Sequence, residues 1–510
     1  MDALFIFPTG TMLFGVPLGI ANLAACLRQS GAEVKIIDLR YQHESQLITE
    51  VNSKDYKIIG IYSSSEIANV SCELLKKIEN LSPHSFFVVG GPHATLDPKF
   101  FLEKGFDIIL KGESERTIVE VFKTISKINN KNTPEEYNKL SSVKGIIWKK
   151  KAGEIITNQP QPYIEDLDTL PFPAYDLFPN IKESFKINYT WTNLQPFTHV
   201  LTSRGCPYHC TFCQPVLFNM FGPTIRRMSA KRVFELLSWL KNEYKIKEVF
   251  FEDDLLFHYS WKEWMFDIFD LINKNNLDIR WWGQSRANSS TREMLERAKK
   301  AGCYMVMCGC ESGSQKILDY YHKQLKVQDI ENMFKMCKEV GLMTIAEIIF
   351  GAPIETTEDA QKTVELIKRI KPDNVFTTIL TAYPGTYLYN ELKKSNINFE
   401  QNFDKISRAV PTQKVQSQLT QEQIDKFQTQ IIPPNPSIKY ILQRKYYRET
   451  FEMKIKNLIE QKEFGKLKNL LMLTASDHAV IKMRPLYRKY RNTALMKTIG
   501  NIYRKVRTNA

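Results

Sequence analysis

Short apolar runs alternate with amphipathic segments through the first 130 residues of the chain. The apolar runs are bounded by turn residues, as is typical of buried parallel strands, and they read ALFIF, VKIID, KIIGIYS, FFVVGG and FDIIL. The segments between them have helical spacing, for example IANLAACLRQSG, which ends on the helix-stopping Gly31. This alternation predicts a doubly wound α/β domain over residues 1–142, with ligands beyond the carboxyl ends of its strands.

The pattern is interrupted after this first series and then resumes. Residues 143–197 combine a predicted hairpin with a proline-rich interdomain linker, because prolines at 160, 162, 171, 173 and 179 prevent a helix or an inner strand. Alternating strands and helices then predict a partial (β/α)6 barrel over residues 198–395, with strands near 199–203, 247–252, 279–285, 304–309, 343–349 and 374–380. Residues 396–510 are expected to form a mainly helical, basic C-terminal region.

The start of the chain bears on its location in the cell. Residues 3–27 carry no charged side chain, and their number alone would suit a membrane span. Glycines and prolines at 8, 10, 15, 17 and 19 instead divide this run into a strand, a loop and a helix. The chain begins Met1-Asp2 rather than with the basic residues of a signal peptide. We therefore expect a cytoplasmic protein.

The net charge of +14 is concentrated in a basic tail at the carboxyl end. Residues 438–510 contain 18 Lys or Arg and 5 Asp or Glu, interleaved with apolar residues, whereas the rest of the chain is nearly neutral. An amphipathic basic helix would have this composition, and it would place the protein at the inner face of the membrane. A solvated face without a partner is the alternative, and nucleic acid is a less suitable partner.

Three of the nine cysteines lie close together after the first barrel strand. The segment TSRGCPYHCTFCQP spaces Cys206, Cys210 and Cys213 as C-x3-C-x2-C, which in a large protein indicates metal binding rather than disulfides. Three thiolates leave one iron of a [4Fe–4S] cluster open, as a catalytic site requires. The alternatives are a structural zinc site with His209 and a chance group of thiols. Four other barrel cysteines suit apolar packing better than a second cluster: Cys303, Cys308, Cys310 and Cys337.

The cysteine motif, with the aromatic Phe212 before its last cysteine, resembles the signature of the radical S-adenosylmethionine (SAM) superfamily. The resemblance implies that SAM chelates the open iron and that one electron cleaves it to a 5′-deoxyadenosyl radical. Segments at the ends of later strands agree with this family, and Arg286 suits the SAM carboxylate because a guanidinium forks onto a carboxylate. The predicted SAM contacts, each of which could instead be a salt bridge or a helix cap, are Phe212, Glu252, Asp253, Asp254, Gln284, Arg286, Glu311, Ser312 and Glu347.

Residues 88–122 and the linker LDTLPFPAYDLF are similar to the Rossmann-like cobalamin-binding domain that precedes many radical SAM barrels. That group includes class B methylases and the anaerobic cyclase of chlorophyll synthesis. Many cobalamin proteins carry Asp-x-His-x-x-Gly after the first strand, but FPTGTMLFG has no histidine, so cobalamin is expected to lack this lower ligand. The predicted cobalamin contacts, which could also be ordinary turns, are Thr9, Gly10, Ser63, Ser64, Ser65, Gly90, Gly91, Gly112 and Glu113.

The resemblance implies a cobalamin-dependent methyltransferase that acts on an unactivated carbon of a small-molecule or lipid-like substrate and needs an electron donor. Radical oxidation, cyclisation or carbon–carbon bond formation is the main alternative. A methylthiotransferase acting on RNA would need three more cysteines in the first domain, where only Cys26 and Cys72 occur. A non-catalytic cobalamin-binding or membrane-binding module would have no need of the cysteine motif.

Overall fold

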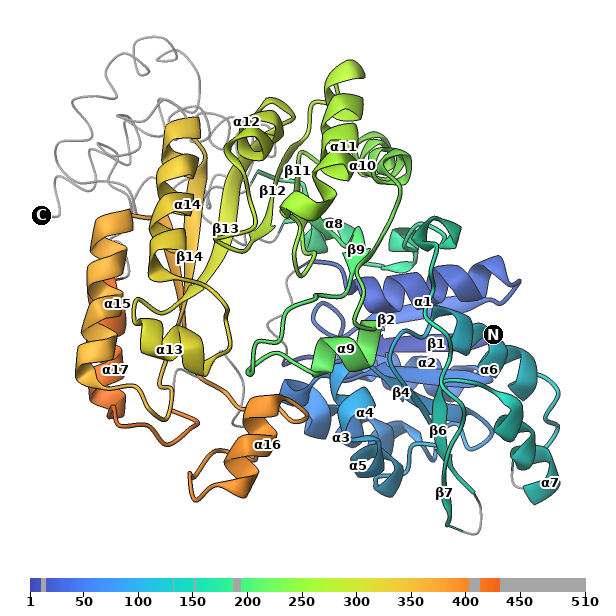
Figure 1. Cartoon of the computed structure of the whole chain (residues 1–510). Coiled ribbons are helices and arrows are strands. Elements are labelled where there is room, and N and C mark those ends of the chain that lie inside the picture. The colour runs from blue at the N-terminus through green and yellow to red at the C-terminus, as the bar shows by residue number, and fades with distance from the viewer. Residues whose placement is uncertain (11–14, 132, 151–152, 187–193, 403–412, 432–510) are drawn as a thin grey trace, which may run out of the picture.

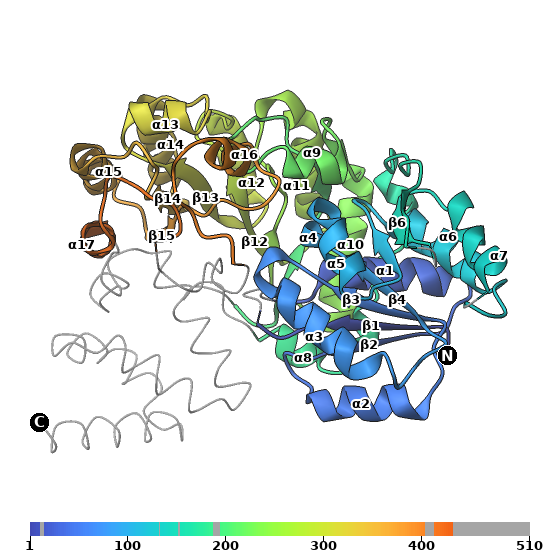
Figure 2. The ribbon, with the colours of Figure 1, turned by 90° about the horizontal axis from the view of Figure 1, so that it is seen from below.

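Figure 1 shows the computed structural model, which describes residues 1–10, 15–131, 133–150, 153–186, 194–402 and 413–431. Two mainly parallel sheets form its framework and lie side by side, each covered by its own helices (Figures 1 and 2). The loops at the carboxyl ends of the two sheets face the boundary between them, and this arrangement positions the site.

The first sheet has seven strands in the order β2-β1-β3-β4-β5-β6-β7. Its parallel strands are β1 (Ala3–Phe7), β2 (Val34–Asp38), β3 (Ile58–Tyr62), β4 (Phe86–Gly90) and β5 (Ile108–Leu110). One face packs on α1 (Leu18–Gln29) and α6 (Glu115–Ile125), and the other on α2 (Glu44–Ser53), α3 (Ala68–Ile78) and α5 (Pro98–Glu103). Alternate residues of β1 enter the two cores, because successive side chains of a strand point to opposite faces. The doubly wound domain is confirmed.

The segment predicted as hairpin and linker is more closely integrated than its composition indicated. The hairpin strands β6 (Ile146–Lys149) and β7 (Ile155–Thr157) extend the first sheet, because β6 pairs antiparallel with β5. The proline-rich stretch contains no long helix, but Tyr175 is fully buried and stacks on Trp239 with ring centroids 5.6 Å apart. Proline interrupts regular hydrogen bonding without preventing the burial of neighbouring aromatic side chains. The stretch therefore acts as packing between the two sheets.

The second sheet is an open, curled half-barrel of six parallel strands in the order β15-β14-β13-β12-β11-β8. This confirms the predicted partial barrel. The strands are β8 (Phe197–Val200), β11 (Glu248–Phe251), β12 (Arg280–Ser285), β13 (Cys303–Glu311), β14 (Met343–Phe350) and β15 (Asn374–Ile379). A continuous outer layer of helices covers it, namely α10 (Ala230–Tyr244), α11 (Lys262–Lys274), α12 (Arg292–Lys300), α14 (Val327–Val340) and α15 (Thr357–Ile370).

Aromatic side chains and one buried carboxylate close the amino-terminal end of the half-barrel. Phe250 and Trp282 stack with ring centroids 4.0 Å apart. The Glu248 carboxylate is fully buried and accepts hydrogen bonds from the Trp282 indole at 3.1 Å, the Tyr304 hydroxyl at 2.6 Å and the Leu194 amide at 2.7 Å. A buried charge with several donors is stable, so this end is a packed floor that leaves the carboxyl end for chemistry.

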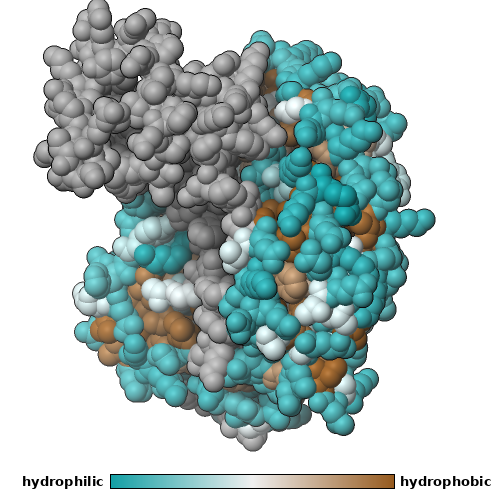
Figure 3. Space-filling model, turned by 90° about the vertical axis from the view of Figure 1, so that its left-hand side faces the viewer, coloured by the Kyte–Doolittle hydropathy of each residue, from teal (hydrophilic) through white to brown (hydrophobic). Residues whose placement is uncertain are grey.

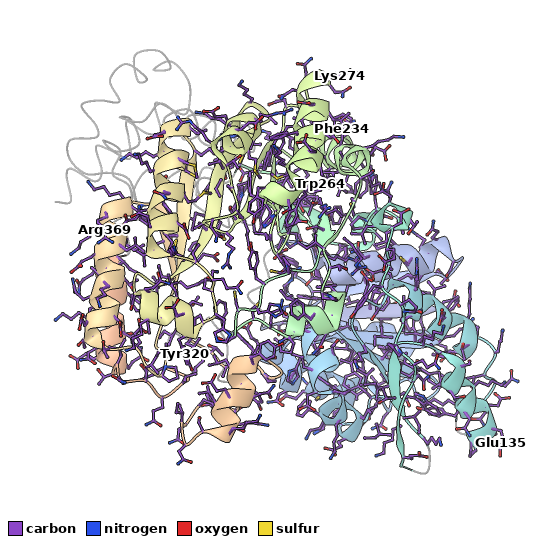
Figure 4. The ribbon with its side chains drawn as sticks, in the orientation of Figure 1. Glu135, Phe234, Trp264, Lys274, Tyr320 and Arg369 are labelled. Atoms are coloured by element: carbon purple, nitrogen blue, oxygen red, sulfur yellow. The ribbon has the colours of Figure 1, made fainter. Side chains whose placement is uncertain are left out.

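Three further helices belong to the second half of the described chain. Tyr320 of α13 (Gln315–Tyr320) reaches Glu391 of α16 (Tyr387–Lys394) with an oxygen–oxygen distance of 3.5 Å (Figure 4). Helix α17 (Gln421–Ile431) packs against α15. No helix among the described residues is long and apolar enough to cross a membrane. The basic tail from residue 438 lies outside the described residues, so its membrane role stays a prediction.

The described surface shows no large apolar face in the view of Figure 3, where brown residues occur in small groups among teal ones. The large apolar side chains that are exposed lie far apart in the sequence: Met1, Ile48, Ile155, Tyr259 and Tyr387. Scattered exposure of this kind is ordinary for a folded protein and does not mark a binding surface.

Candidate active site

The cysteine loop begins and ends in a small antiparallel ribbon made of β9 (Ser203–Arg204) and β10 (Arg226–Arg227). It follows β8, the edge strand of the half-barrel, so all three cysteines lie at the carboxyl end of the second sheet. Helix α9 (Val216–Phe221) leads the chain from the last cysteine back to the ribbon. This is the end of a β/α barrel at which active sites are built.

The three cysteines are free thiols. Burial, with smaller contributions from the charges of Asp254 and Cys210, raises the pKa of Cys206 to about 11. Burial likewise raises the pKa of Cys213, with added repulsion from Cys206 and Cys210. Iron would reverse this effect, because metal-bound thiols are deprotonated. His209 is exposed and packs edge-on against Phe218, so it does not complete a zinc site.

Cysteine thiolates are the ligands that hold iron–sulfur clusters, so the donor set of the loop fits such a cluster. Within the described residues, no three His, Cys, Asp or Glu side chains are placed to hold a single metal ion. Cys206, Cys210 and Cys213 stay the predicted ligands of the cluster, with one iron left for SAM.

Arg286 has an unused donor beside the cysteines. Its guanidinium lies over the Tyr208 ring at 3.9 Å, and its Nη1 is 4.0 Å from the Cys210 sulfur. Its Nε donates to the Asn288 side chain at 3.1 Å, but Nη2 is buried and donates to no group of the described chain. A buried donor without an acceptor is costly, and a carboxylate is the acceptor that a guanidinium prefers. The predicted contact with the SAM carboxylate is consistent with this placement.

A second buried cation, Lys323, also lies near the cysteine loop, and the sequence analysis did not single it out. Lys323 is 8% exposed, pairs with Glu311, and lies 5.9 Å from the Phe212 ring. The residues on either side of it, His322 and Gln324, both have φ of 49°. A left-handed φ is uncommon outside glycine, and here the turn directs the lysine inward. Nothing in the sequence pattern distinguishes this lysine from surface lysines.

Several predicted SAM contacts are already engaged by protein groups, Glu311 with Lys323 among them. Asp253 is fully buried and accepts hydrogen bonds from the Thr202 amide at 3.0 Å and the Ser203 hydroxyl at 2.5 Å. It thereby fastens the start of the cysteine loop to β11. The Ser312 hydroxyl is fully buried and bonds to Thr363 at 3.1 Å. These contacts do not test SAM binding, so these assignments stay predictions.

The other predicted contacts lie at the open mouth of the half-barrel. Gln284 and Glu347 are half-buried and project to the same face of the sheet, as the strand register shows. Glu252 is 2.7 Å from His199 Nδ1, and its carboxylate raises the pKa of that histidine, which burial alone would lower. Burial raises the pKa of Asp254 to about 7. The mouth is therefore lined with polar side chains, in contrast to the aromatic floor.

The predicted cobalamin contacts follow the carboxyl ends of β1, β3, β4 and β5. Gly90 ends β4, and at Gly91, where φ is 110° and ψ is −179°, an added Cβ would lie 2.5 Å from the Ser63 carbonyl oxygen. Only glycine adopts this backbone conformation without strain. The Ser64 hydroxyl beside it is buried and has no hydrogen-bond partner in the described chain. The glycine lets the loops after β3 and β4 lie against each other, and the unused Ser64 hydroxyl fits a bound ligand.

The remaining residues of this edge are distributed around the same loops. Thr9 and Gly10 lie in the loop after β1 and are exposed. The Ser65 hydroxyl lies 3.0 Å from His93 Nδ1, and burial lowers the pKa of His93 to about 4. His93 is therefore neutral at physiological pH and is held within the domain.

The loop after β5 joins the cobalamin edge to the cysteine loop. At Gly112, where φ is 68°, an added Cβ would lie 3.2 Å from the carbonyl oxygen of Met220 in α9. Helix α9 also packs on α4 (Pro92–Leu96), the helix after β4 (Figure 1). Glu113 is 8% exposed and pairs with Arg204 and Arg226 of the ribbon. The two predicted cofactor sites are thus neighbours.

Glu355 follows β14 in the segment IFGAPIETTED and is fully buried. Its Oε2 accepts the amide hydrogens of Gly351 at 2.6 Å and Ala352 at 3.2 Å, while Oε1 has no partner in the described chain. Burial raises the pKa of Glu355 from 4.5 to about 7. A group with a raised pKa stabilises the fold below its unfolded pKa, and this contribution is lost as the pH rises through the folded value.

Glu355→Gln should therefore remove a pH dependence of stability. The free energy of unfolding of the wild type should fall relative to that of the variant by about 3 kcal/mol between roughly pH 5 and pH 8. Glutamine imitates the protonated acid and keeps the two amide contacts. Denaturant titrations at several pH values measure this, with Glu358→Gln as control because the Glu358 side chain is 80% exposed. Parallel pH profiles for the wild type and Glu355→Gln would contradict the assignment.

Comparison with known protein families agrees with this geometry. The B12 binding domain matches residues 13–122, and the Radical SAM superfamily matches residues 200–367. An uncharacterized methyltransferase, PH0819, of Pyrococcus horikoshii is 33% identical over 419 residues, which cover 81% of this chain and 86% of the relative. Cytidylyl-2-hydroxyethylphosphonate methyltransferase of Streptomyces wedmorensis is 27% identical over 390 residues, which cover 66% of this chain and 69% of the relative.

A solved structure shares the fold. It is the radical SAM methyltransferase TsrM of Kitasatospora setae with cobalamin and a [4Fe–4S] cluster bound, and it superimposes with a TM-score of 0.62 at 17% identity. The match covers 77% of this chain and 75% of that one. Both domains occur here in the same order, and the Pyrococcus relative aligns over most of both chains at 33% identity. The chain belongs to the family of radical SAM enzymes that carry an amino-terminal B12-binding domain.

Proposed function

We propose that this chain is a cobalamin-dependent radical SAM methyltransferase that methylates an unactivated carbon of a small molecule. The observation that carries the proposal is the contact between the two predicted cofactor sites. Helix α9, which follows the last cysteine, packs on α4 and on Gly112 at the cobalamin edge (Figures 1 and 2). A methyl group and a substrate radical must meet at one place, and adjacent sites allow this.

The chain supplies binding and orientation for the reaction. When bound, the iron–sulfur cluster would provide the electron that cleaves SAM, and cobalamin would provide the carrier for the methyl group. Arg286 holds the SAM carboxylate through its unused Nη2, and Lys323 with Glu311 flanks the same loop. The stacked Phe250 and Trp282 of the floor exclude water from below, which protects a reactive radical.

The substrate enters at the polar mouth of the half-barrel. Glu252, Gln284 and Glu347 are all partly exposed there, which supports a substrate with polar groups. The Streptomyces relative is named for a phosphonate, a small polar molecule. The alternative is a lipid-like substrate taken from a membrane surface, and it would depend on the basic tail.

Gly91→Ala tests the cobalamin edge. The substitution should weaken cobalamin binding about tenfold or more, because a side chain in this backbone region costs of order 1–3 kcal/mol and displaces the loop. The absorbance of cobalamin retained after desalting measures the effect, and iron content verifies that the barrel is folded. Gly19→Ala is the control, since an added Cβ there meets nothing within 4 Å. Equal cobalamin retention by the wild type and Gly91→Ala would show that this edge is not the binding site.

Measuring whether the formation of S-adenosylhomocysteine requires cobalamin tests the proposed function. The reconstituted protein, with reductant and SAM, should form S-adenosylhomocysteine only when cobalamin is bound, because methyl transfer from SAM requires an acceptor. Cleavage to 5′-deoxyadenosine should continue without cobalamin. S-adenosylhomocysteine formed equally with and without cobalamin would contradict the proposal, and its absence in both would favour radical oxidation or cyclisation.

A further inference from the structure

Four buried charged side chains tie the cysteine loop to the first domain. Arg204 pairs with Glu113, and its Nη2 lies 2.5 Å from Glu115 Oε1. Arg226 Nη1 lies 2.9 Å from Glu113 Oε2 and donates to the Ile164 carbonyl at 2.6 Å. All four charged residues are between 6% and 8% exposed. The network is neutral as a whole, and each charge has a partner, as a buried network requires.

The network sits at the base of the cysteine loop. Arg204 lies two residues before Cys206, and Arg226 is its direct cross-strand partner in the ribbon that closes the loop. On the other side, Glu113 directly follows Gly112, which touches α9. One carboxylate of the first domain therefore holds both β9 and β10, the two strands between which the cysteine loop runs.

We propose that Glu113 is a positioning residue that fixes the separation between the cluster and cobalamin through Arg204 and Arg226. The inference rests on the proposed function, because it requires both cofactors to be bound. With the separation fixed, each radical forms within reach of the methyl group. Without Glu113 the base of the loop can shift, so that radicals form without methyl transfer.

Other contacts hold the two domains together, so the network is not needed for docking alone. His199 Nε2 lies 2.6 Å from the Val16 carbonyl oxygen, and the Tyr163 hydroxyl donates to Phe218 at 3.2 Å. One continuous apolar core also includes residues of both sheets, with Tyr175 between them. Loss of Glu113 should therefore free the loop base while the domains stay associated.

The distance between the two cofactors in Glu113→Gln tests whether Glu113 positions the loop or only helps the domains to dock. In the holoenzyme, pulsed dipolar electron paramagnetic resonance between cob(II)alamin and the reduced cluster should give one narrow distance distribution. Glu113→Gln should broaden or shift that distribution in the molecules that carry both cofactors, which the measured iron and cobalamin contents count. During SAM turnover the variant should also form severalfold more 5′-deoxyadenosine per S-adenosylhomocysteine.

A matched control is Asp107→Asn, which weakens a partly buried pair with Lys131 within the first domain. Asp107 lies at the amino end of β5, opposite Glu113, so this variant should lose stability and keep the narrow distribution. If Glu113→Gln does not fold, Glu113→Asp keeps the charge, is one methylene shorter and should also broaden it. An unchanged distribution in either folded variant would overturn the inference, and a wild type without bound cobalamin would overturn the proposed function as well.

Discussion

Replacing Cys210 by alanine will reduce SAM cleavage to the level of an enzyme-free control. The thiol is buried in the cysteine loop, 4.0 Å from Arg286 Nη1, and it is one of the three predicted cluster ligands. Two thiolates cannot hold a catalytic cluster with one open iron. The loss of the cluster is measured by the iron and sulfide content and by the electron paramagnetic resonance spectrum of the reduced protein. The loss of SAM cleavage is measured by the yield of 5′-deoxyadenosine.

Cys337→Ala is the control for this experiment. Cys337 is fully buried in α14, away from the cysteine loop, and removal of its thiol should leave iron content and SAM cleavage unchanged. Loss of iron in this variant would indicate a second cluster on the barrel cysteines. Normal SAM cleavage by Cys210→Ala would contradict the assignment of the cluster ligands.

Arg286→Gln should weaken SAM binding by roughly 10- to 100-fold, because a hydrogen bond to a charged group is worth about 1.5–3 kcal/mol. The substitution removes the guanidinium fork and its charge beside the site where the SAM carboxylate is expected. Arg286→Lys should recover part of the affinity, since it restores the charge without the fork. Calorimetric titration of the reconstituted protein with SAM measures the dissociation constant.

Arg280→Gln provides the comparison for Arg286. Arg280 begins the same strand, β12, at its amino end, where its guanidinium lies 4.4 Å from the Tyr304 ring. SAM affinity should be unchanged in this variant. An equal loss of affinity in both variants would mean that Arg286 acts through the fold of β12 rather than on SAM.

The strands and the cysteine loop could be predicted from sequence because their signals are local. A run such as FFVVGG combines β-branched and aromatic residues with a glycine stop, and β4 ends at Gly90 within it. The cysteine spacing is likewise contained in one loop. The parallel strands of both sheets could therefore be predicted from the apolar pattern, whereas the addition of β6 and β7 to the first sheet could not.

The interface between the domains could not be predicted, because it depends on residues that are distant in sequence. Glu113 stays a predicted cobalamin contact, and the pairing of its carboxylate with Arg204, which is 91 positions away, carries no local signal. Tyr175 lies in a proline-rich stretch whose composition indicates an open linker, and it is buried only because both sheets pack around it. Lys323 faces inward owing to two left-handed residues that carry no glycine signal.

The fate of SAM during turnover tests the central claim most directly. The anaerobically reconstituted protein with cobalamin and reductant is given SAM labelled with a CD3 group and a cell extract of small molecules and lipids. We expect 5′-deoxyadenosine and S-adenosylhomocysteine in equal amounts, dependent on the extract, together with a product that carries the CD3 group. 5′-Deoxyadenosine without S-adenosylhomocysteine would contradict methylation, and the absence of even slow SAM cleavage would contradict the radical SAM assignment itself.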